Sequence, residues 1–290
     1  MLTKLRLIAH RIGTFHLHFV HPHFVLRTFF NESSLGRFGT IAAAFWLLAP
    51  MGVYAQRGTP PAQSPKAAAV VDFTGYWVSL VTNSEQWLIR MATPAKGDYR
   101  GMGLTPEGRK LADAWDPAKD EAAGEMCKAY GAPAIMQVPG RLHITWEDDR
   151  TLRIDTDAGK QTRLLHFGRP PEAAGEPTMQ GQSTAQWDSQ GGRSTEGGGA
   201  AGLRFAGSSL KVTTTHLRPG YLFKNGVPYS GKALLTEYFN RLEEPDGNSF
   251  LVVSELLEDP QYFSEPFIRP WYFKKIPDAK GWNPADCTTR

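Results

Sequence analysis

Two carboxylates lie among apolar residues in one stretch of the chain, residues 234–257. Glu237 is followed by Tyr238 and Arg241, and Glu255 belongs to the next apolar run. A carboxylate beside an arginine inside a barrel could bind a polar group of a ligand or act in acid–base catalysis. Facing outward, the same residues would form an exposed cross-strand ion pair worth less than about 1 kcal/mol, and we favour this second interpretation.

Three histidines lie in the body of the chain, far apart in sequence: His143, His166 and His216. Inward-facing positions on different strands of a barrel converge, and histidine suits proton transfer or metal ligation near neutral pH. His143, however, alternates with Leu142 and Ile144 and should point away from the apolar face. We therefore favour strand-end or solvent-facing positions for all three, and keep His166 and His216 as candidate ligand contacts.

The sequence contains no familiar cofactor or metal motif. Gly197–Gly199 is not followed by Lys-Ser/Thr, and Gly-x-Ser-x-Gly and Cys-x-x-Cys are both absent. The other five histidines resemble a metal-binding tract, but they lie upstream of the processing site predicted below: His10, His16, His18, His21 and His23. The sequence therefore predicts no cofactor and no metal site.

We expect the elements that position these residues to be mainly short strands. The plainest signal is a hairpin: two runs rich in β-branched and aromatic residues, 234–241 and 250–257, flank the turn residues Pro245–Asn248. Further strands are expected at 72–81, 86–91, 135–138, 142–146, 152–156, 162–167, 179–187, 209–216 and 266–274. Their tryptophans should mainly fill the core, although Trp146 is a candidate for lining an apolar ligand cavity.

One segment, near residues 105–127, has a helical signature. Thr105-Pro106 and Asp116-Pro117 each place a capping side chain before a proline at the first helical position. We expect a two-helix insertion that forms a lid or plug for one mouth of a barrel. Residues 188–202 are rich in glycine and without period, which predicts a flexible loop.

Many short antiparallel strands with tight turns predict a mainly β protein, a single meandering antiparallel barrel over residues 72–290. A β-sandwich is the alternative.

The N-terminal residues 1–55 look like an export signal with an upstream extension. Arg37 precedes a short apolar run, Ile41–Ala49, which is followed by Val53-Tyr54-Ala55, a small-x-small cleavage pattern. The run is too short for a comfortable membrane span. We predict cleavage after Ala55, a periplasmic or extracellular location, no membrane segment after cleavage, and a disordered linker over residues 56–71.

The charge balance argues against nucleic-acid binding. Five of the 32 basic residues and one of the 29 acidic residues lie before residue 56, which leaves 27 basic and 28 acidic residues in the remainder. A near-neutral body lacks the basic face that neutralises phosphates.

The only two cysteines, Cys127 and Cys287, lie after the predicted cleavage site. Exported proteins meet an oxidising compartment, and an even number of cysteines there usually pairs. The C-terminal tail around Cys287 would fray unless it were fastened. We predict a Cys127–Cys287 disulfide; the alternative is two free buried thiols.

The opening Phe73-Thr74-Gly75-Tyr76-Trp77 resembles the Gly-x-Trp start of lipocalins and related calycin barrels, in which the tryptophan closes the base of the barrel. A series of short motifs covers most of the body: Met126-Cys127, Gln137–Gly140, Trp146-Glu147, Gln182–Trp187, Ser209–Thr214, Leu235–Phe239 and Glu258–Tyr262. In kind and order these motifs resemble those of a group of uncharacterised exported bacterial proteins without an established activity. This likeness implies an exported lipocalin-like barrel and assigns no catalytic residue.

Three functions follow as hypotheses. The preferred one is an exported lipocalin-like barrel that binds a small apolar or amphipathic molecule. The second is a barrel enzyme, an isomerase, cyclase or hydrolase, that uses Glu237 or Glu255 with Tyr238, Arg241 or a histidine. The third is a non-catalytic structural or interaction module with a filled barrel.

Overall fold

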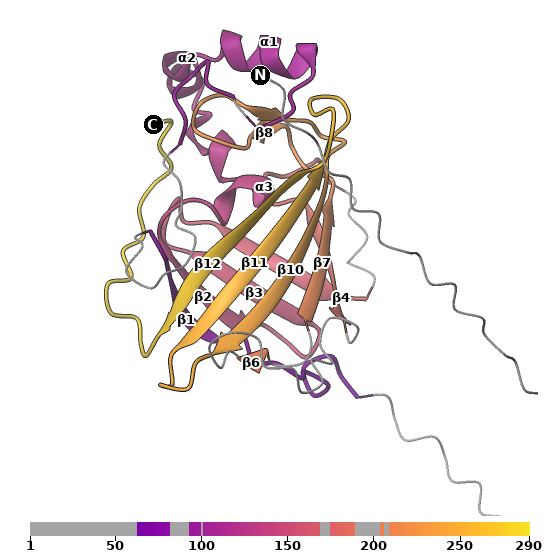
Figure 1. The fold of residues 1–290 in the computed structure, drawn as a ribbon, viewed down its shortest axis with the longest axis vertical. Helices are drawn as coiled ribbons and strands as arrows, with labels where there is room; N and C mark the ends of the chain where they lie inside the picture. The colour runs from indigo at the N-terminus through magenta and orange to yellow at the C-terminus, as the bar shows by residue number, and fades with distance from the viewer. Residues whose placement is uncertain (1–62, 82–92, 100, 169–174, 189–203, 206–208) are drawn as a thin grey trace, which may run out of the picture. The chain divides into compact units, whose positions relative to one another are not determined.

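The computed structural model describes residues 63–81, 93–99, 101–168, 175–188, 204–205 and 209–290. Within these ranges the chain is mainly β, with short helices gathered at one end of the sheet (Figure 1). The predicted export signal, the expected strand at 86–91 and, apart from Asp188, the glycine-rich loop at 188–202 lie outside the described residues.

Nine strands of the described chain close into a barrel, as the sequence predicts. They run in the order β11-β12-β1-β2-β3-β4-β5-β7-β10, and pairing of β10 with β11 closes the ring. β4 and β5 pair in parallel, and the other neighbours are antiparallel. The strands are β1 (Gly75–Ser79), β2 (Arg141–Trp146), β3 (Thr151–Thr156), β4 (Thr162–Phe167), β5 (Gln182–Asp188), β7 (Ser209–Thr215), β10 (Leu234–Glu243), β11 (Ser249–Glu258) and β12 (Phe267–Ile276).

Three two-residue strands accompany the barrel: β6 (Arg204–Phe205) at the edge of β10, and the small pair β8 (Gly220–Tyr221) and β9 (Pro228–Tyr229).

The predicted hairpin forms the longest pairing of the barrel. β10 and β11 are paired along ten residues, with Glu237 directly opposite Glu255. In the turn, the Asp246 side chain accepts a hydrogen bond from the Asn248 backbone (2.9 Å), and Gly247 has a φ of 87°, a conformation that glycine adopts without strain. Local turn chemistry therefore sets the register of these two strands.

Alternation along each strand sends one set of side chains into a packed interior. Large residues fill it from many strands, and several are almost completely buried: Trp77, Ile144, Ile154, Leu165, Phe239, Leu251 and Phe273. Trp77, the tryptophan of the Gly-x-Trp motif, has no exposed surface, and its Nε1 donates to the Phe73 carbonyl oxygen at 2.9 Å. The centre of the barrel is thus built largely of apolar side chains.

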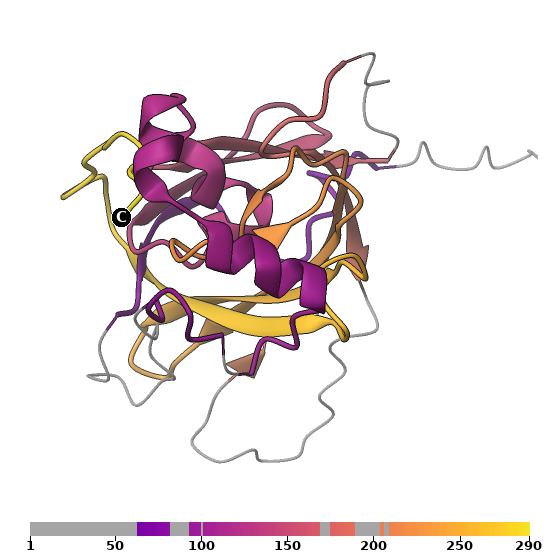
Figure 2. The same ribbon diagram turned by 90° about the horizontal axis from the view of Figure 1, so that it is seen from above.

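The helical insertion is capped as the sequence predicts. Thr105 accepts a hydrogen bond from the Gly108 backbone at the start of α1 (Pro106–Ala114), and Asp116 accepts one from Ala118 at the start of α2 (Pro117–Ala122). A 3₁₀ turn, η2 (Met126–Tyr130), and a one-turn helix, α3 (Ala132–Ile135), follow. Together these helices lie across one end of the barrel (Figures 1 and 2). No helix of the described chain has the length and apolar character needed to cross a membrane.

The strand expected at residues 135–138 is wrong. Ala132–Ile135 is helical, with Pro133 in its first turn, and Ile135 and Met136 are buried in the same apolar cluster as the barrel interior. A short apolar run has the same composition in a buried strand and in a buried helix, so periodicity alone does not separate the two.

The structure describes the linker expected at residues 56–71 from residue 63 onward. Residues 63–71 of the expected linker lie against the barrel: the Trp187 indole donates to the Pro65 carbonyl oxygen at 2.9 Å, and Val71 is buried in the core. A proline-rich composition predicts an extended chain, but an apolar residue that reaches the core still gains burial energy.

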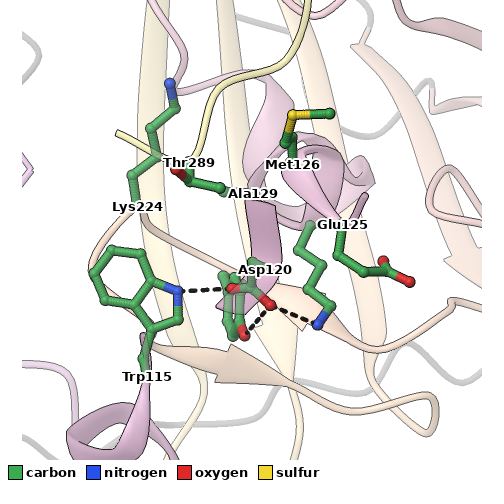
Figure 3. Close-up of a pocket in the computed structure, with 9 residues that line it drawn as sticks. Trp115, Asp120, Glu125, Met126, Ala129, Lys224 and Thr289 are labelled. Atoms are coloured by element: carbon green, nitrogen blue, oxygen red, sulfur yellow. Dashed lines mark hydrogen bonds and ion pairs between the residues drawn. The ribbon is translucent and has the colours of Figure 1, made fainter. Parts of the chain in front are cut away.

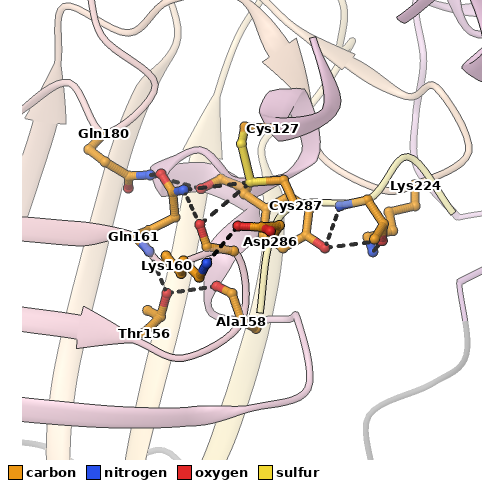
Figure 4. Close-up of a disulfide and its surroundings, with 12 residues drawn as sticks. Cys127, Thr156, Ala158, Lys160, Gln161, Gln180, Lys224, Asp286 and Cys287 are labelled. Carbon is orange, nitrogen blue, oxygen red and sulfur yellow. Dashed lines mark hydrogen bonds and ion pairs between the residues drawn. A yellow bond between two sulfur atoms is a disulfide. The ribbon is translucent and has the colours of Figure 1, made fainter. Parts of the chain in front are cut away.

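The predicted cysteine pair is confirmed. The sulfur atoms of Cys127 and Cys287 lie 2.09 Å apart and their Cα atoms 5.1 Å apart, across 160 residues of chain (Figure 4). The link joins η2 to the C-terminal tail. Further tail contacts lie beside it, including an ion pair between Lys160 and Asp286 (2.8 Å) and a backbone hydrogen bond from Ala285 to Asp157 (2.9 Å).

Candidate functional site

The interior of the barrel contains a fully buried ion pair. Both guanidinium Nη atoms of Arg163 donate to the two carboxylate oxygens of Glu237, at 2.8 and 2.5 Å, and neither side chain has any exposed surface. This position overturns the outward-facing pair that we favour from the sequence. Glu237 shares its strand face with the buried Leu235 and Phe239, and alternation carries all three inward.

The Glu237 carboxylate stabilises the positive charge of Arg163. Burial alone would lower the pKa of Arg163, but the nearby Glu237 carboxylate outweighs burial and raises it, with a smaller contribution from the charge of Glu255. Glu255 is itself buried, and its carboxylate accepts a hydrogen bond from the Trp271 indole. The site is therefore a charged cluster inside an apolar shell, in which both Glu237 oxygens are already engaged.

The other two hairpin candidates lie elsewhere. Arg241 donates to the Ser249 hydroxyl and the Asp72 carbonyl oxygen and pairs with Glu243, near the turn end of the hairpin. Tyr238 lies on the opposite face of β10 from Glu237, with the Lys211 ammonium 5.8 Å from its ring centroid. The structure thus brings Glu237 and Glu255 together and leaves Tyr238 and Arg241 outside the cluster.

Sequence reasoning missed Arg163, the partner of Glu237. The available signal is the alternation of β4, in which Arg163, Leu165 and Phe167 occupy one face and are all buried. A charged residue on an apolar face predicts a buried partner, because an isolated buried charge costs several kcal/mol.

The remaining candidates are separate from one another. His166 lies 3.3 Å from the Thr151 hydroxyl, and His216 lies 3.1 Å from the Thr215 hydroxyl. Trp146 stacks on Phe167, with ring centroids 5.5 Å apart. In the part of the chain that the structure describes, no group of three or more His, Cys, Asp or Glu side chains is placed to hold a metal ion.

His143, as predicted, points away from the apolar interior and belongs to a cleft on the outside of the barrel. Its ring stacks on Tyr76, its cross-strand partner, at 4.1 Å and 4° between planes. Trp282 of the C-terminal tail stands almost perpendicular to both rings, at 6.0 Å from Tyr76 and 6.2 Å from His143. The cleft has a volume of about 350 Å³, and Pro284 also lines it.

Polar side chains from β3, β4 and the turn between them form the rim of the cleft: Asp155, Thr156, Lys160, Gln161 and Thr162. We call this rim, together with Tyr76, His143 and Trp282, the outer aromatic cleft. Burial would raise the pKa of Asp155, but hydrogen bonds from Arg153 and Thr162 outweigh burial and lower it, so this carboxylate stays ionised at neutral pH.

The C-terminal tail forms one wall of the outer aromatic cleft. Trp282 and Pro284 lie a few residues before Cys287, and the tail is fixed by the disulfide, by the Ala285–Asp157 backbone hydrogen bond and by the Lys160–Asp286 ion pair. Figure 4 shows Asp286 and Cys287 beside Lys160 and Gln161. The cleft therefore exists because the tail is held against the strands.

A second hollow, under the helical insertion, is already filled. Asp120 is buried there and accepts hydrogen bonds from the Trp115 indole (3.0 Å), the Lys128 ammonium (2.8 Å) and the Tyr221 hydroxyl (3.4 Å) (Figure 3). The space left is about 10 Å³, enough for about one water molecule. This hollow is a polar anchor between the helices and β8.

Comparisons with protein-family models, with curated proteins and with solved structures gave no match. The likeness to lipocalins thus rests on the sequence motifs, and the structure supports its coarser part, a closed β-barrel.

Proposed function

We propose that this protein is a binding module, a β-barrel scaffold that takes a small amphipathic molecule in the outer aromatic cleft. The observation that carries the proposal is the cleft itself: about 350 Å³, three aromatic rings and a polar rim. Small-molecule sites commonly have volumes of about 300–1,000 Å³ and combine aromatic walls with a few polar groups.

The geometry favours this cleft over the barrel interior as the ligand-binding site. Both oxygens of Glu237 are occupied by Arg163, and Glu255 is hydrogen-bonded to Trp271. A carboxylate held in a bidentate ion pair is poorly placed to accept a proton from a substrate, which favours binding over the barrel-enzyme hypothesis. The filled-module hypothesis stays the alternative, and a binding experiment separates it from the proposal.

We expect Trp282→Ala to weaken binding of the ligand about tenfold or more, because aromatic anchors dominate binding sites. The full chain would be screened against fatty acids, aromatic compounds, steroids and sugars by native mass spectrometry and thermal shift, and hits titrated against the variant. Ile268→Ala is the matched control: its side chain is 60% exposed and its strand position pairs with Leu256 rather than with β1.

Two results would count against the proposal. Absence of any hit would favour the filled module. A hit that binds the Trp282→Ala and Ile268→Ala variants equally well would place the ligand away from the outer aromatic cleft.

Export is the second part of the proposal, and the disulfide supports it because disulfides persist mainly in oxidising compartments. We expect the secreted form to begin after Ala55. N-terminal sequencing of the protein recovered from outside the cytoplasm tests this: a mature chain that still contains Phe45 and Trp46 contradicts the predicted cleavage.

A further inference from the structure

The charges around the outer aromatic cleft are already compensated in pairs. Asp155 accepts a hydrogen bond from the Arg153 guanidinium at 2.8 Å, and the Lys160 ammonium lies 2.8 Å from the Asp286 carboxylate. Two cations and two anions balance here, so an ionic ligand meets little net charge and gains little from ion pairing with these water-exposed groups. A neutral ligand needs no such charge, and the paired groups still offer lone pairs and N–H donors to it.

The aromatic side chains offer flat apolar surface next to these polar groups. The stacked Tyr76–His143 pair and the nearly perpendicular Trp282 line the cleft together, and Asp155 and Thr162 continue the row of Tyr76 and His143 across β3 and β4. The register makes this row continuous: Tyr76 is opposite His143, His143 opposite Asp155, and Asp155 opposite Thr162. A ligand that fits must therefore present an apolar face to the rings and hydrogen-bonding groups along its edge.

A sugar ring has this combination, because its C–H groups form an apolar face and its hydroxyl groups lie around the rim. Carboxylate, amide, hydroxyl and ammonium groups all bond sugar hydroxyls, and the rim contains all four kinds of group, in Asp155, Gln161, Thr162 and Lys160. The chain of a fatty acid would bring no hydrogen-bonding groups to this rim, and its carboxylate would meet a Lys160 ammonium that is already paired with Asp286.

We propose that the outer aromatic cleft binds a neutral saccharide, with the sugar face on the aromatic rings and its hydroxyl groups on the polar rim. This inference rests on the proposed function and narrows its ligand to one chemical class.

The test uses the full chain and a defined sugar panel. Glucose, galactose, N-acetylglucosamine, cellotriose and chitotriose are the neutral probes; glucosamine and glucuronate are the charged probes; laurate is the apolar probe. Saturation-transfer NMR and titration calorimetry measure binding. At least one neutral sugar is expected to bind, more tightly than its charged counterpart, with saturation strongest on the C–H protons of one ring face.

Substitutions test whether the sugar contacts the named residues. Trp282→Ala is expected to weaken binding about tenfold or more, Trp282→Phe to retain part of the affinity, and Asp155→Asn to weaken binding of the sugars but not of laurate. Ile268→Ala, the matched control, should bind like the unaltered chain. Circular dichroism of each variant confirms that the barrel is folded.

The outcomes separate this inference from the proposed function. Binding of laurate or another non-sugar without any neutral sugar overturns the saccharide inference and leaves the binding module intact. Preference for glucosamine or glucuronate overturns the argument from charge compensation. Failure of every compound in this panel overturns the saccharide inference, and the binding module falls with it only if the wider screen against fatty acids, aromatic compounds and steroids also gives no hit.

Discussion

Arg163→Met is expected to lower the free energy of unfolding by about 3–5 kcal/mol, because it leaves the Glu237 carboxylate buried without its partner. Both side chains are completely buried, so water cannot replace the lost guanidinium. Urea unfolding, followed by circular dichroism, measures the change, and the midpoint should fall without a large change in slope.

The double variant Arg163→Met with Glu237→Leu supplies the decisive control. Removing both charges takes away the unpaired Glu237 carboxylate, while the Glu255 carboxylate keeps its hydrogen bond from the Trp271 indole. Apolar residues of similar size in place of a buried pair are often neutral or stabilising. We therefore expect this variant to regain most of the stability that Arg163→Met loses.

The exposed pair Arg153–Glu147 gives a surface comparison. Its side chains are 39% and 44% exposed, and Glu147→Gln should cost less than about 1 kcal/mol. If Arg163→Met also lowers the free energy of unfolding by less than about 1 kcal/mol, the interior pair is hydrated in solution. That result would contradict the buried position of Glu237.

The second large effect is expected from the disulfide. Replacing Cys127 and Cys287 together by serine should lower the free energy of unfolding by up to roughly 5 kcal/mol, the chain-entropy figure for a loop of this size, with native-state strain reducing it. The sequence separation of 160 residues is what makes the figure large, because the unfolded chain gains the most freedom when a long loop opens.

The same variant reports on the outer aromatic cleft. Loss of the link should loosen the tail that carries Trp282, so ligand binding is expected to weaken together with stability. Urea unfolding with and without dithiothreitol provides the measurement, and the double serine variant, which has no thiol to reduce, should be insensitive to the reagent. Equal stability of the oxidised and reduced chains would mean that the remaining tail contacts hold Cys287 in place without the bond.

Local features of this fold could be predicted from the sequence because a few neighbouring residues determine them. The β10–β11 hairpin follows from its turn residues and flanking strands, and the starts of α1 and α2 follow from Thr105 and Asp116 before prolines. The outward direction of His143 follows from its alternation with Leu142 and Ile144. The Cys127–Cys287 pair could be predicted because two cysteines allow only one intramolecular link.

The tertiary structure decided which side chains meet in the barrel interior and in the outer aromatic cleft. Arg163 and Glu237 are 74 residues apart, and nothing near either one in sequence indicates the other. Alternation along β10 places Glu237 and Arg241 on one face, but only closure of the barrel makes that face the interior and sets Arg163 of β4 across from it. The outer aromatic cleft likewise depends on a tail that folds back over β1 and β2 to bring Trp282 to Tyr76. The physical reason is that alternation repeats every two residues and so specifies a face, whereas burial and partners come from strands that meet only after long loops have closed.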